Sequence, residues 1–120
     1  MRIGIDIIEV ERVEAAIEKH GEKFLRRIFT RKEIEYCSRK RKAHQSFAGR
    51  FAAKEAVLKA IGTGLSSGIG WKDIEILNDD YGRPYVILHG RARELLNGRR
   101  IDISISHSDT CATAVCIIYE

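Results

Sequence analysis

The chain has 120 residues, of which 44% are hydrophobic and 32% charged, and its formal net charge is +4. This length fits a single domain spanning residues 1–120, and the balance excludes a disordered chain and a membrane-spanning one, because no long apolar run is present. The apolar start is interrupted by Arg2 and Asp6 and lacks the pattern of a signal peptide, so we expect a cytoplasmic protein.

The first half of the chain predicts one strand followed by helices. A β-branched run opens it, and apolar residues then recur at helical spacing. Thr30 and Glu33 have the spacing of a capping box, and Gly62 is a typical helix terminator. We expect a strand at residues 3–8 and helices at 9–20, 24–28, 30 to about 40, and from 45 or 46 to 61.

Beyond the glycine-rich loop at 62–70, the hydrophobic pattern changes to a period of two residues. This pattern predicts an antiparallel hairpin around a turn at 79–82, and a final pair of strands joined by a turn at 107–110. The expected strands are 73–78, 83–89, 100–106 and 111–119, with a short helix at 91–96. Because helices cluster before strands, the order indicates an α+β fold with helices packed on an antiparallel sheet.

Charge is unevenly distributed along the chain. Residues 6–22 are mainly acidic, whereas residues 23–42 are strongly basic and carry glutamates only at positions 33 and 35. A basic block of this kind suits an acidic protein, a phosphate-rich ligand or nucleic acid. A solvated helical face is the alternative.

The central helix contains four charged residues that invite a functional interpretation. Arg50 and Lys54 fall inside its apolar arc, where they either snorkel to solvent or face a subunit boundary or an anionic ligand. Glu55 and Lys59 are four residues apart and so share one helix face. They form either an ordinary helix-stabilising ion pair or the side of a ligand site, because the neighbouring residues are small.

Isolated side chains elsewhere leave their roles open. Asp6 lies among apolar strand residues and must be solvated, hydrogen-bonded, paired or metal-bound. His107 lies between two predicted strands, where it is a loop residue, a hydrogen-bonded and partly buried one, or a catalytic one. Cys37, Cys111 and Cys116 have neither CxxC nor metal-site spacing, which indicates reduced structural thiols.

Three segments together resemble one known family. GIDIIEVERV at 4–13, FAGRFAAKEAVLKAIGTG at 47–64 and GRPY at 82–85 are similar to the acyl-carrier-protein synthase family of small 4′-phosphopantetheinyl transferases. Matching features run from the first strand to the last, so the resemblance covers essentially the whole chain. It implies the α+β fold of that family, a homotrimer, and active sites between neighbouring subunits.

The resemblance also implies a reaction and a set of site residues. The 4′-phosphopantetheine arm of coenzyme A, the substrate, would pass to a serine of an acyl carrier protein of fatty-acid synthesis, and 3′,5′-ADP would leave. Asp6 and Glu55 take the positions of the magnesium ligands, and Lys59 has a phosphate-binding or proton-handling role. Glu55 is also the candidate to receive the serine proton. The candidate ligands of the coenzyme A phosphates are Arg50, Lys54, Lys59 and His107.

Basic residues after the first strand are candidates for docking the acidic carrier protein. They are Arg12, Lys19, Lys23, Arg26 and Arg27.

Two other functions remain open from the residues alone. A nucleic-acid-binding module would use the basic run RKRK at 39–42, but no recognised binding signature accompanies that run and it leaves the acids unexplained, so no nucleic-acid partner is expected. A metal-dependent phosphohydrolase would use the same acids to transfer phosphate to water.

Overall fold

The computed structural model describes residues 1–120. A long helix, α4, lies at the centre of the fold. The helices are α1 (Val10–His20), α2 (Glu22–Ile28), α3 (Arg31–Ser38), α4 (Ala43–Ile61) and α5 (Gly90–Leu96), with short 3₁₀ turns η1 (Gly64–Ser67) and η2 (Trp71–Asp73). The strands are β1 (Arg2–Glu9), β2 (Ile74–Asn78), β3 (Pro84–Leu88), β4 (Ile101–His107) and β5 (Cys111–Ile118). The α+β prediction is confirmed.

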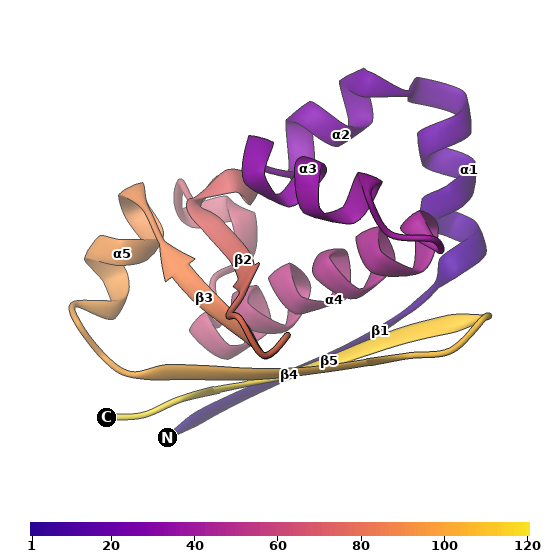
Figure 1. Cartoon of the computed structure of the whole chain (residues 1–120). Coiled ribbons are helices and arrows are strands. Elements are labelled where there is room, and N and C mark those ends of the chain that lie inside the picture. The colour runs from indigo at the N-terminus through magenta and orange to yellow at the C-terminus, as the bar shows by residue number, and fades with distance from the viewer.

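The strands form two antiparallel sheets. One has three strands in the order β1-β5-β4, and the other is the hairpin of β2 and β3. Helix α4 covers one face of the three-stranded sheet, with α2 and α3 on its far side, whereas no helix covers the opposite sheet face (Figure 1). Ile3, Ile5 and Ile7 of β1 are 63%, 62% and 69% exposed on that bare face.

The contact between α4 and the sheet depends on small residues. Alanines of α4 are fully buried against the strands, and Gly4 of β1 faces them. A Cβ atom at Gly4 would lie 1.9 Å from the backbone oxygen of Ala56, far inside van der Waals contact. Only glycine therefore allows β1 to approach α4 this closely. The approach matters for function because Asp6 lies two residues further along β1.

Helices α1 to α3 enclose a second cluster of buried apolar side chains, built around Phe29 and Phe47. The capping box is confirmed, because Thr30 Oγ1 accepts from the Glu33 backbone and the Glu33 carboxylate accepts from the Thr30 N–H. Helix α3 ends earlier than expected, and α2 and α4 begin two or more residues earlier. None of the helices combines the length and apolar content required to cross a membrane.

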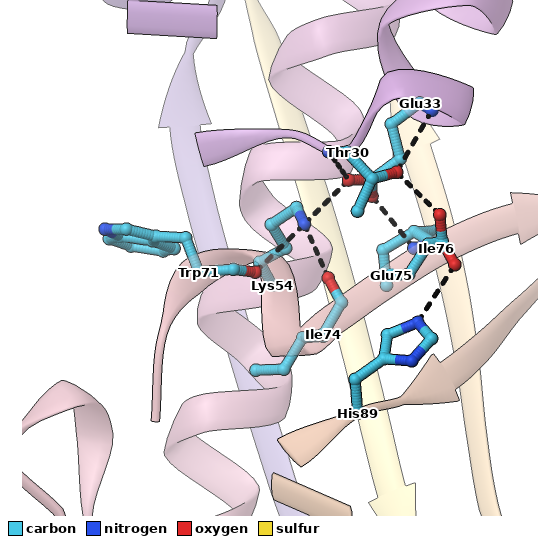
Figure 2. Close-up of polar contacts among 8 residues, drawn as sticks. All are labelled: Thr30, Glu33, Lys54, Trp71, Ile74, Glu75, Ile76 and His89. Atoms are coloured by element: carbon cyan, nitrogen blue, oxygen red, sulfur yellow. Dashed lines mark hydrogen bonds and ion pairs between the residues drawn. The ribbon is translucent and has the colours of Figure 1, made fainter. Parts of the chain in front are cut away.

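A buried ion pair joins α3, α4 and β2 (Figure 2). Lys54 and Glu33 are both fully buried, with 2.8 Å between the lysine Nζ and the carboxylate. The ammonium also donates to the backbone oxygens of Trp71 and Ile74, and the carboxylate accepts from the backbone N–H of Ile76. Burial lowers the pKa of Lys54, and the nearby Glu33 carboxylate opposes that effect.

Glu75 extends this network toward the surface (Figure 2). Its carboxylate accepts from the Thr30 hydroxyl at 2.6 Å and lies 3.1 Å from Nε2 of the half-exposed His89. Burial alone would raise the pKa of Glu75, but the hydrogen bonds from Thr30 and His89 outweigh burial and lower the pKa. A connected set of polar groups thus runs from the surface to the buried lysine.

Candidate active site

Asp6 and Glu55 line the same cavity, although they are far apart in the sequence. The cavity has a volume of about 400 Å³ and lies between β1, α1, α2 and α4. Its other lining residues are mainly apolar and include Phe24 and Phe51, and one cation, Arg12, is at its wall. Strand β1 supplies one acid and α4 the other, and the close approach at Gly4 brings these two elements together.

Lys59 lies beside Asp6, but its ion-pair partner is not Glu55, the partner that helical spacing favours. Its ammonium lies 3.0 Å from the Asp6 carboxylate and 3.0 Å from the backbone oxygen of Ile5. The helix ion pair with Glu55 is therefore replaced by an ion pair to the strand. The side chain of Asp6 is only 14% exposed, so this pair also fixes the carboxylate against α4.

The electrostatics of Glu55 are those of a carboxyl held beside another acid. Burial raises its pKa, the negative charge of Asp6 raises it further, and the positive charge of Lys59 lowers it. With both carboxylates ionised, the two acids and one lysine carry a net negative charge. Oxygen donors with this charge can hold a hard divalent cation or accept a proton.

A second cavity, of about 440 Å³, is lined mainly by polar and basic side chains. Arg50 and His107 both line it, as the sequence predicts for two residues of one ligand site. A Cβ atom at Gly49 of α4 would lie 3.1 Å from the side chain of Ile105, so α4 packs closely here against β4, the strand that carries His107. Three further cations line the cavity, namely Lys40, Arg41 and Lys42. This surface is suited to phosphate groups.

Lys54 lines neither cavity. Its side chain is fully buried, and its ammonium is paired with Glu33 and donates to the two backbone oxygens. The residue therefore neither snorkels nor faces a ligand, and we omit it from the candidate phosphate ligands. The five basic residues expected to dock a partner are all exposed, on α1 and α2.

Several cavity residues were not among the candidates from the sequence. Phe24 and Phe51 form the apolar wall beside the acids, and Lys40, Arg41 and Lys42 surround Arg50 and His107. The basic run at 39–42 is a signal that could have identified the last three. The aromatic pair has no such signal, because its residues resemble ordinary core positions.

The sequence of this chain matches a known protein family and named relatives. Residues 2–115 match the family described as the 4′-phosphopantetheinyl transferase superfamily. The chain is 50% identical over 115 residues to a holo-[acyl-carrier-protein] synthase of Protochlamydia amoebophila, covering 96% of this chain and 94% of the relative. It is 47% identical over 120 residues to the enzyme of the same name from Koribacter versatilis, covering 98% and 96%.

Solved structures agree as well. The Helicobacter pylori holo-[acyl-carrier-protein] synthase in complex with coenzyme A superposes with a TM-score of 0.87 at 33% identity, covering 98% of this chain and 99% of that one. A Bacillus anthracis holo-(acyl-carrier-protein) synthase in complex with CoA (3′,5′-ADP) gives a TM-score of 0.81 at 38% identity, covering 98% and 94%. By sequence and fold, the chain belongs to the 4′-phosphopantetheinyl transferase superfamily.

Proposed function

We propose that this protein transfers the 4′-phosphopantetheine arm of coenzyme A to a serine of an apo-acyl carrier protein, releasing 3′,5′-ADP, in support of fatty-acid biosynthesis. The observation that carries the proposal is the meeting of Asp6 and Glu55 at one cavity, with Lys59 paired to Asp6, in a chain whose relatives are named holo-[acyl-carrier-protein] synthase. We assign the reaction to the cytoplasm, where the free thiols of this chain would stay reduced.

The acid pair fits magnesium by the chemistry of its donors. Magnesium takes oxygen ligands and is commonly held by one or two carboxylates together with substrate phosphates. Asp6 and Glu55 would hold it. Burial and then the negative charge of Asp6 raise the pKa of Glu55, and a bound cation would relieve the repulsion between the two acids. When bound, the ion would neutralise charge that develops on the transferred phosphate.

The chain's own residues have distinct proposed roles in the transfer. Glu55, directly or through water, would receive the proton of the carrier serine as its oxygen attacks the β-phosphate of coenzyme A. Lys59 would stabilise negative charge on the phosphate oxygens. Its side chain is 54% exposed, and its ammonium lies 3.0 Å from the carboxylate of Asp6, which lines the cavity.

The basic cavity is the proposed site for the remaining phosphates of coenzyme A. Arg50 and His107 would contact them, together with the cations of the 39–42 run that line the same cavity. However, this cavity lies toward β4 and the acid cavity toward β1, at opposite edges of the three-stranded sheet. A complete site would therefore combine the acid cavity of one subunit with the basic cavity of its neighbour.

A homotrimer would meet that requirement and would also cover the bare sheet face. A row of three exposed isoleucines on β1 is an apolar surface of the kind that subunit interfaces bury. We expect sedimentation equilibrium to give the mass of three chains, and Ile5→Glu to dissociate the assembly and abolish transfer. A wild-type monomer that is fully active at assay concentrations would contradict the shared site.

Docking of the acidic carrier is assigned to the exposed basic side chains of α1 and α2. Changing Arg26 and Arg27 to Glu should raise the KM for the carrier protein about tenfold at low salt and weaken its salt dependence, while the KM for coenzyme A changes little. The matched control changes the exposed Arg91 and Arg93 on α5 to Glu. If the two double variants change the KM for the carrier protein equally, α2 is not a specific part of the docking surface.

The proposed reaction differs from hydrolysis in its dependence on the carrier. We expect 3′,5′-ADP to be released from coenzyme A and magnesium only when an apo carrier protein is present. Release without a carrier would identify a phosphohydrolase instead. Binding of nucleic acid at physiological salt, with no turnover of coenzyme A, would identify a nucleic-acid-binding module.

A further inference from the structure

Arg50 is a buried cation that has no acidic partner. The residue is only 4% exposed, yet its guanidinium lines the basic cavity and its Nε atom has no hydrogen-bond partner. A buried charge is costly unless it is paired or hydrogen-bonded. The protein therefore keeps this cation in place with neutral groups, which leaves its charge available to an anion.

Asn78, at the end of β2, provides one of those neutral groups. Its Oδ1 accepts a hydrogen bond from Nη2 of Arg50, and its Nδ2 donates to the backbone oxygen of Gly82 at 2.8 Å. The second bond ties the side chain to the β2–β3 turn. Because its donor is engaged in the turn, the acceptor of the amide is directed at Arg50.

Tyr36 of α3 provides the other neutral group. The Cζ atom of Arg50 lies 4.3 Å from the centre of the tyrosine ring, a cation–π contact. The ring restrains the plane of the guanidinium, and the amide fixes the direction of one of its edges. A guanidinium held in this way loses little conformational entropy when a ligand binds.

The backbone position of Asn78 is supported by contacts other than the one to Arg50. Lys54, one turn further along α4, donates to the backbone oxygen of Ile74 at the start of β2 (Figure 2). The other end of the strand is held by the pairing of Asn78 with Pro84 in the hairpin. Strand β2 is thus fixed along α4, and Asn78 acts from a rigid base.

We propose that Asn78 and Tyr36 are positioning residues that preorganise Arg50 for an anionic group of coenzyme A. This inference rests on the proposed function and deepens it. Both residues also line the cavity, so the competing explanation is that each touches the ligand directly. The two explanations differ in one respect: positioning residues lose their effect when Arg50 is absent.

A double-mutant cycle separates these explanations, with 3′,5′-ADP as the calorimetric probe. We expect Asn78→Ala to raise the Kd for 3′,5′-ADP about tenfold, and to raise the KM for coenzyme A with kcat changed by less than about twofold. In an Arg50→Gln background, the same change should alter the Kd by less than about twofold. Tyr36→Leu, on a different element, should show the same dependence on Arg50. Agreement between the two variants would exclude a local distortion of the hairpin as the cause.

Each alternative outcome has a definite meaning. Equal effects of Asn78→Ala with and without Arg50, in variants that keep the wild-type circular dichroism and melting temperature, would overturn the positioning role in favour of direct contact. An unchanged Kd in the wild-type background would overturn it as well. If the double-mutant cycle shows the expected coupling but the wild-type protein transfers nothing, the proposed function alone is contradicted. If the wild-type protein does not bind 3′,5′-ADP, the positioning role and the proposed function are both overturned.

Discussion

Glu55→Gln is expected to lower turnover by at least about a hundredfold, because it removes both a proposed magnesium ligand and the proposed proton acceptor. The glutamine keeps the size and polarity of the side chain, so the fold should persist. Turnover should be measured across a magnesium titration. If Glu55 also accepts the serine proton, added magnesium cannot restore the wild-type rate.

Asp6→Asn provides the matched comparison. It removes a ligand charge but no proton acceptor, so high magnesium should restore more of its turnover than that of Glu55→Gln. Glu9→Gln, an exposed carboxylate on the same strand, is the control and should behave as wild type. Asp6 and Glu55 variants that keep the fold and oligomeric state of the wild type, with wild-type turnover at low magnesium, would show that these acids are structural.

Lys54→Met is expected to cost about 3–5 kcal/mol in the free energy of unfolding, since it leaves the fully buried Glu33 carboxylate without its cation. The backbone oxygens of Trp71 and Ile74 would lose a donor as well. Urea denaturation at a fixed protein concentration measures the loss, because the stability of an oligomer depends on concentration.

The double variant Glu33→Gln/Lys54→Met tests the physical reason. It removes the uncompensated charge, so we expect it to be more stable than Lys54→Met alone, even though it lacks the whole ion pair. If the loss of stability in the double variant equals the sum of the losses in the two single variants, Lys54 and Glu33 do not stabilise each other. Each would then contribute only through its own other contacts.

The sequence predicted the local elements well because their signals are local. The capping box at Thr30 and Glu33 gave the start of α3, and the alternating pattern gave the final strands. The helix starts at 22 and 43 were missed because neither has a side-chain cap. The division of the strands into two sheets could not be predicted, since the pairing of β1 with β5 joins opposite ends of the chain.

Parts of the site depended on contacts that no local pattern contains. The helical spacing of Lys54 showed only that a cation lies among apolar residues, and its partner Glu33 comes from another helix. The spacing of Glu55 and Lys59 favoured an ion pair between them, whereas the structure pairs Lys59 with a strand residue. The shared cavity of Asp6 and Glu55 was expected from family resemblance alone, because spacing gives no reason for residues on different elements to meet.

The intact mass of an apo-acyl carrier protein, measured before and after incubation with this protein, coenzyme A and magnesium, tests the proposed transfer most directly. We expect the carrier to gain the mass of one phosphopantetheine arm, and a carrier whose acceptor serine is replaced by alanine to gain nothing. A carrier of unchanged mass, after incubation with folded enzyme under conditions in which a known holo-acyl-carrier-protein synthase modifies it, would contradict the proposed function.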